Sequence, residues 1–113
     1  MDKVAAYREA IKKALNWFVD IDHRQPNPQG EVYLIADEKS DDYILMELGW
    51  QGDKKIQVMR VFARIRNGKI YIEEDWTEDG IADDLLDTGV PKEDIVLAFH
   101  PPNMRQYTEF AAA

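Results

Sequence analysis

The dipeptide Asn67-Gly68 constrains the fold of this 113-residue chain more than any other feature. A two-residue type I′ turn needs positive φ at both central positions, and Asn-Gly is the strongest short signal for it. Apolar residues alternate on both sides, so the pair predicts a hairpin between strands at 55–66 and 69–75. The turn also fixes the register of this hairpin. The predicted cross-strand pairs are Arg66–Lys69, Ile65–Ile70, Arg64–Tyr71, Ala63–Ile72, Phe62–Glu73 and Arg60–Asp75.

A second tight turn at Gly52-Asp53 joins a strand at 42–50 to this hairpin. It pairs Leu48 with Gln57, Met46 with Met59 and Ile44 with Val61, which assigns Ile44, Met46 and Leu48 to the buried face. The opposite face then combines arginine with aromatic and aliphatic residues: Tyr43, Leu45, Glu47, Val58, Arg60, Phe62, Arg64 and Tyr71. Such a mixture is typical of protein-binding surfaces. Trp50, at the tip of the same hairpin, is a further candidate anchor for a partner.

The rest of the chain completes an α+β fold. Apolar residues at helical spacing predict an amphipathic helix over about 2–20. Thr77 as cap and Gly89 as stop predict a second helix near 78–88. The other expected segments are a polar loop at 22–31 and strands at 31–38 and 95–99. We therefore expect one domain over residues 1–113, an antiparallel meander of about four to five strands packed with both helices.

Charge is distributed unevenly along the chain. The net charge is −8, yet residues 54–69 hold six of the 14 cations and no acid, whereas residues 73–94 hold ten acids and one lysine. Neutralisation of one block by the other in the fold is the simplest interpretation. In one version of it, the acidic helix near 78–88 lies across the arginine-rich face. The alternative is a DNA-binding module that uses the basic hairpin at 54–69.

Composition also limits the compartment and the class of site. The chain has no cysteine, so it forms neither disulfides nor thiolate metal sites. Charges interrupt the N-terminal segment where a signal peptide needs an apolar run, and no run approaches the roughly 20 residues that span a bilayer. We expect a soluble, cytoplasmic protein that has no contact with membranes.

Few residues point to catalysis. His100 precedes two prolines, which end a strand and turn the chain, and no second histidine or nucleophile accompanies it. The string Asp37-Glu38-Lys39 resembles half of a metal-dependent nuclease signature, but a turn between strands explains it as well. There is no glycine-rich phosphate loop. The residues predict no catalytic group, no metal and no cofactor, and a metal-dependent nuclease is kept as an alternative.

Several strings resemble one family. "LGWQG", "NGKIYIEED" and above all "TEDGIADDLLDTGVPKEDIVLAFHPPNMRQYTEFA" are similar to the XisI family, the cyanobacterial fdxN element excision controlling factors. The resemblance implies a non-enzymatic accessory protein of site-specific DNA excision in heterocyst development. Such proteins act with a recombinase and with XisH, a protein that resembles restriction-type nucleases. It further implies an XisH-like partner. The mixed arginine and aromatic face could instead be covered by another copy of the chain, and the charge balance predicts weak or indirect contact with nucleic acid. The candidate partner-binding residues are Trp50, Arg60, Phe62, Arg64, Tyr71, His100 and Arg105.

Overall fold

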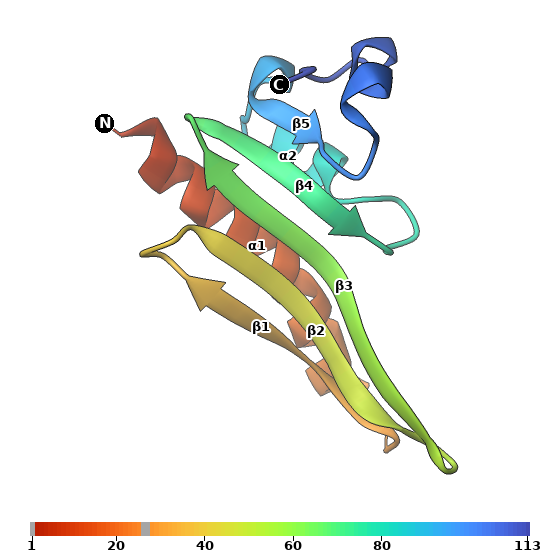
Figure 1. Cartoon of the computed structure of the whole chain (residues 1–113). Helices are drawn as coiled ribbons and strands as arrows, with labels where there is room; N and C mark the ends of the chain where they lie inside the picture. The colour runs from red at the N-terminus through yellow and green to blue at the C-terminus, as the bar shows by residue number, and fades with distance from the viewer. Residues whose placement is uncertain (1, 26–27) are drawn as a thin grey trace.

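The computed structural model describes residues 2–25 and 28–113 and shows a five-stranded sheet with both α-helices on one of its faces (Figure 1). The elements are α1 (Lys3–Arg24), β1 (Gly30–Asp37), β2 (Asp42–Gln51), β3 (Lys54–Arg66), β4 (Lys69–Asp75), α2 (Ala82–Asp87), β5 (Ile95–Leu97) and the 3₁₀ helices η1 (Lys92–Asp94) and η2 (Pro102–Tyr107). The strands lie in the order β1-β2-β3-β4-β5. The predicted α+β class is confirmed.

Helix α1 supplies one wall of the core. Asp2 caps it, because the Asp2 side chain accepts a hydrogen bond of 3.0 Å from the backbone N–H of Val4. Ile11 and Leu15 are fully buried against the sheet, as their helical spacing predicts. The helix ends at Arg24, later than the predicted residue 20. The predicted polar loop is correspondingly shorter, and its residues 26 and 27 lie outside the described residues.

Strands β1 to β4 form the predicted antiparallel meander, but two β-bulges change its register. The pairs at both turns are confirmed, as far as Met46–Met59 in one hairpin and Ala63–Ile72 in the other. Beyond them β3 contains the extra residue Arg60, and β4 contains the extra residue Glu73. The predicted pairs Ile44–Val61, Phe62–Glu73 and Arg60–Asp75 are therefore wrong. The observed pairs are Leu45–Val61, Ile44–Phe62, Phe62–Glu74 and Val61–Asp75.

Relative to the predicted register, the bulge at Arg60 places each side chain of β2 on the opposite face of the sheet, because a shift of one residue turns every side chain to the other side. Tyr43 and Leu45 are buried in the core with Val61, so their predicted place on the opposite face is wrong. Glu47 and Val58 also lie on the helix side. Ile44, Met46 and Leu48, which the sequence assigned to the core, lie instead on the face away from the helices.

Helix α2 is shorter than predicted and begins at Ala82, with Ile81 rather than Thr77 before it. The carboxylate of Asp75 instead holds the loop between β4 and α2 by accepting hydrogen bonds from its backbone. It accepts hydrogen bonds from the N–H of Thr77 at 2.9 Å and from the N–H of Ile81 at 2.7 Å. Ile81 and Leu85 are buried in the same core as α1, so α2 lies on the helix side. The expectation that this acidic helix crosses the arginine-rich face is wrong.

Strand β5 pairs with β4 in parallel, which makes the sheet mixed rather than purely antiparallel. The connection through α2 returns the chain to the same end of the sheet, as a parallel neighbour requires. The strand covers Ile95–Leu97 only, shorter than the predicted 95–99. The C-terminal segment then folds back beside it, where the N–H of Ala111 donates to the carbonyl of Ile95 at 2.9 Å.

Candidate functional site

The face of the sheet away from the helices is the largest candidate site, and we call it the outer face (Figure 1). Besides Trp50 at its far end, the register of β1 to β4 assigns eight apolar or aromatic residues to it: Tyr33, Ile35, Ile44, Met46, Leu48, Met59, Phe62 and Tyr71. Seven of them are half-buried among their neighbours, and Ile35 is 40% exposed. A sheet face exposed to water normally carries polar residues, so the composition of this face is unusual for a solvent-exposed one.

The arginines of the outer face are paired within the chain. Arg64 Nε lies 3.2 Å from Asp42 Oδ1, and Arg66 donates to the same oxygen at 3.1 Å. Burial raises the pKa of Asp42, but the hydrogen bonds and charges around it, those of Arg66 and Arg64 included, outweigh burial and lower the pKa. The guanidinium of Arg64 also lies 5.9 Å from the centre of the Phe62 ring. The acids of β2, rather than the acidic block at 73–94, therefore neutralise most of this charge.

Arg60 does not lie on the outer face. As the extra residue of the bulge, it turns its side chain toward the end of α1, where it lines a small pocket with Phe18 and Ile21. Its guanidinium donates to Glu47 Oε1 at 3.1 Å. The predicted position of Arg60 beside Phe62 and Arg64 is wrong, since the register on which it rests is broken at this residue.

Trp50 lies at the far end of the outer face, on the β2–β3 hairpin that extends past the other strands (Figure 1). Its side chain is 53% exposed, and the ammonium of Lys55 lies 4.8 Å from the centre of the indole ring. Phe62, Arg64 and Tyr71 share the face with it. The structure thus brings four of the predicted partner-binding residues to one side of the sheet.

His100 and Arg105 lie apart from these four, in the C-terminal segment. Arg105 donates to the backbone carbonyls of His100 at 3.0 Å and Ala98 at 3.1 Å, so its guanidinium holds the fold of this segment. The imidazole of His100 packs against Phe99, with ring centres 4.7 Å apart. No hydrogen bond joins that imidazole to another side chain in the described part of the chain.

The same segment exposes three large apolar side chains that sequence reasoning missed. Phe99 is 46% exposed, Met104 48% and Tyr107 76%. Phe99 lies just beyond the observed end of β5, and Met104 and Tyr107 follow two prolines in a stretch without helical or strand periodicity, so no pattern indicated which way they point. Arg105, which bonds two carbonyls of the same stretch, fixes the segment that carries them.

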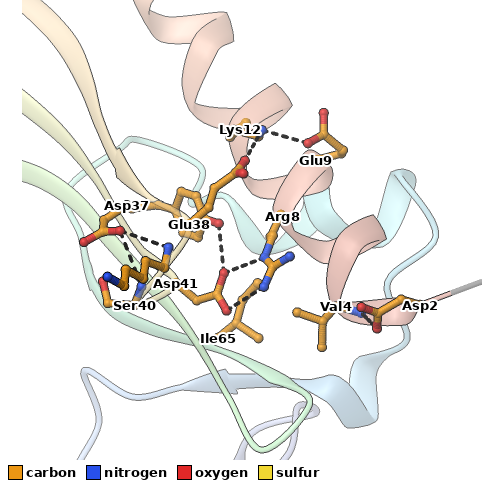
Figure 2. Close-up of polar contacts among 12 residues, drawn as sticks. Asp2, Val4, Arg8, Glu9, Lys12, Asp37, Glu38, Ser40, Asp41 and Ile65 are labelled. Carbon is orange, nitrogen blue, oxygen red and sulfur yellow. Dashed lines mark hydrogen bonds and ion pairs between the residues drawn. The ribbon is translucent and has the colours of Figure 1, made fainter.

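The side chains of the nuclease-like string at 37–39 make structural contacts in the β1–β2 turn and with α1 (Figure 2). Asp37 Oδ1 accepts the backbone N–H of Lys39 at 2.9 Å, which closes the β1–β2 turn. Glu38 forms an ion pair with Lys12 of α1, and Lys12 also lies 2.8 Å from Glu9. No group of three or more His, Asp or Glu that could hold a metal ion occurs among residues 2–25 and 28–113.

A neighbouring carboxylate, Asp41, joins α1 to the sheet (Figure 2). Arg8 donates to both of its oxygens, at 2.7 Å and 3.2 Å. These hydrogen bonds lower the pKa of Asp41. The hydroxyl of Tyr43 donates to Asp41 at 3.1 Å, and burial together with this bond raises the pKa of Tyr43 to about 12.

An acidic cleft of about 790 Å³ lies between α1 and α2 on the helix side. Its wall carries Trp17, which is 59% exposed, and the single cation Lys13. The acids that line it are Glu78, Asp79, Asp83, Asp84 and Asp87. Burial and the neighbouring carboxylates raise the pKa of Asp84. A cleft with this charge repels the phosphates of nucleic acid.

No helix of the described residues is both long and apolar enough to cross a membrane.

A family model described as XisI protein matches residues 1–112. The crystal structure of the fdxN element excision controlling factor XisI from Anabaena variabilis ATCC 29413 is 41% identical, with a TM-score of 0.86, and the match covers 99% of this chain and 100% of that chain. A XisI-like protein from the same organism is 35% identical, with a TM-score of 0.90 and coverage of 97% and 99%. No curated protein matches the chain significantly.

Proposed function

Since the chain belongs to the XisI family, we propose that it is a control protein in the site-specific excision of an fdxN-type DNA element. The relative with 41% identity is named as an excision controlling factor, and the match covers its whole length, which supports this role. The chain acts as one XisI-like domain over residues 1–113. The role is a cytoplasmic one, because the DNA lies there.

The protein exerts this control by binding an XisH-like partner with a nuclease fold, and it performs no chemistry of its own. The observation that carries this step is the cluster of exposed apolar residues on the C-terminal segment. Of the eight large apolar side chains that are exposed in residues 2–25 and 28–113, three lie between residues 99 and 107. Exposure of such a cluster to water is unfavourable, and a partner that covers it removes this cost.

Tyr107 is the expected centre of the contact. It is 76% exposed, and tyrosine is one of the residues in which binding energy concentrates. The hydrogen bonds of Arg105 to Ala98 and His100 fix the segment before the partner arrives. Binding therefore loses less conformational entropy than it would with a free tail. His100 and Arg105 shape this contact, and Phe99 and Met104 enlarge it.

The test is the affinity of the purified chain for the XisH-like protein of the same genome, measured by isothermal titration calorimetry. Wild type should bind, and Tyr107→Ala should weaken binding at least tenfold, which corresponds to about 1.4 kcal/mol. Trp17→Ala is the matched control, since it removes an aromatic residue that is 59% exposed on α1. Equal losses in the two variants would contradict the assigned surface. Absence of wild-type binding would contradict the partner.

A further inference from the structure

We propose that the outer face binds a second copy of this chain and forms a two-fold symmetric dimer. This inference goes beyond the proposed function, because the dimer forms whether or not an XisH-like partner binds the C-terminal segment. It rests on three properties of the outer face: its extent, the pairing of its arginines, and the order of its residues along the strands.

The extent of the face matches a stable dimer. Strands β1 to β4 lie about 4.8 Å apart, and the 10 residues of β2 extend about 34 Å. Four strand widths multiplied by this length give a flat projection of roughly 650 Å², which side-chain relief increases. A stable interface buries about 800 Å² on each partner. The face is therefore large enough for one standard interface.

The arginines of the face leave little for an acidic partner to recognise. Asp42 pairs with both Arg64 and Arg66, and Arg64 also lies 3.9 Å from Glu73. A partner that selected this face by charge would have to break pairs that are already formed. A second apolar face, with its own arginines paired in the same way, requires no such loss.

The order of residues along the strands is suited to two-fold symmetry. The register forms rows across the sheet, and the central row contains Tyr33, Met46 and Met59. Two rows away on one side lies the pair Trp50–Lys55, and two rows away on the other side lies Asp42–Arg64. A two-fold axis that lies between the two sheets and runs along the central row reverses the strand direction of the second copy. It therefore brings Lys55 and Trp50 of each copy onto the Asp42 row of the other. A dimer with identical surfaces requires this reciprocal match.

The first test is the mass in solution, measured by sedimentation equilibrium at tens of micromolar. Wild type should sediment at twice the 13.1 kDa of one chain. Met46→Glu places two carboxylates against each other at the axis, so it should raise the dimer dissociation constant at least 100-fold. Val58→Glu is the control, because Val58 is an apolar strand residue, 37% exposed, that lies on the helix side. A monomeric wild type, or a Met46→Glu variant that stays dimeric, would overturn the proposal.

The second test covers the case in which Met46→Glu fails to fold. The chain has no cysteine, so Met46→Cys introduces a single thiol with little change in polarity. Packed sheets lie about 10 Å apart, beyond the roughly 7 Å limit between Cα atoms for a disulfide. A short bis-maleimide should therefore join two Met46→Cys chains in high yield and leave Val58→Cys chains separate. Equal yields would overturn the proposal.

The dimer and the contact with the XisH-like partner can be disproved independently of each other. Met46→Glu should still bind the XisH-like protein, and Tyr107→Ala should remain a dimer. Loss of XisH-like binding in Met46→Glu while the mass stays that of a dimer would assign the outer face to the partner, and would overturn the dimer without affecting the proposed control role.

Discussion

Asp41 is the residue on which the junction between α1 and the sheet depends. Its carboxylate binds Arg8 through two hydrogen bonds and accepts the hydroxyl of Tyr43, while its backbone carbonyl accepts the N–H of Ile65 at 3.0 Å. Its φ is +57°, a region that aspartate and asparagine adopt more readily than most residues. The backbone and the charge of Asp41 can therefore be tested independently by replacing it with asparagine.

Asp41→Asn should lower the melting temperature near neutral pH, because Arg8 loses its charged partner while the turn keeps its conformation. The pKa of Asp41 is lower in the folded chain than in the unfolded chain. Its stabilisation is therefore present above the unfolded pKa of about 3.9, and it is lost as pH falls through the folded value. Thermal unfolding followed by circular dichroism between about pH 2 and pH 7 should show the gap to wild type closing in acid. A gap that stays constant would contradict this assignment.

The two hairpins show what turn chemistry predicts and where it fails. Asn67-Gly68 and Gly52-Asp53 place the strands and their first pairs correctly, because these turns impose their geometry locally. The bulges at Arg60 and Glu73 have no such local signal. Strand β2 is apolar on both sides, so its alternation did not show which set of residues α1 would bury. The packing of α1 selected Tyr43 and Leu45, and the outer face received the other set.

The candidate site follows the same division. Phe62, Arg64 and Tyr71 share the outer face as predicted, because the turn at Asn67 fixes the Arg64–Tyr71 pair. Arg60 was misplaced by the bulge. Tyr107 was missed because its exposure depends on how the C-terminal segment folds after Pro102, which no periodic pattern reports.

The start of α2 also depends on a contact that the sequence does not display. Asp75 binds the N–H groups of Thr77 and Ile81 and the hydroxyl of Thr77, and this capping holds residues 76–81 as a loop rather than as a first helical turn. The loop places Ile81 in the core, where it is fully buried. One carboxylate at the end of β4 thus sets the position of the whole connection to β5.

Asp75→Ala should destabilise the chain by roughly 1–3 kcal/mol, because the N–H groups of half-buried Thr77 and buried Ile81 lose a charged acceptor. Urea unfolding measures the total, and hydrogen exchange should locate the increase in exchange at residues 76–87. Asp83→Ala is the control, since Asp83 is exposed on α2 and makes no hydrogen bond or ion pair with any other residue that the structure describes. A uniform increase in exchange along the chain would show that Asp75 does not act locally.

The charge of the molecule as a whole bears on its relation to DNA. Of the cations at 54–69, Arg60 is paired with Glu47, and Arg64 and Arg66 are paired with Asp42. Lys69 donates to the terminal carbonyl of Ala113. Within the described residues, Lys54 and Lys55 are the cations of this block without an acidic or carbonyl partner. The acidic cleft and the net charge of −8 oppose DNA further.

The isolated protein should therefore bind duplex DNA only weakly, with a dissociation constant of about 10⁻⁴ M or weaker at physiological salt, the weak end of non-specific binding. Because each neutralised phosphate contributes about −0.9 to the slope of log K against log salt, the two lysines limit the slope to about −2, and a dimer that covers Lys55 lowers its magnitude further. Fluorescence anisotropy with a labelled duplex between about 50 and 200 mM salt measures both quantities. Lys54→Gln with Lys55→Gln should abolish the residual binding, whereas Lys12→Gln on α1 should not change it. Sub-micromolar binding that is lost on replacing Arg64 and Arg66 would instead show that these arginines leave Asp42 to contact phosphates. The basic hairpin would then be a DNA-binding element, and control of excision would not depend on a partner to reach the DNA.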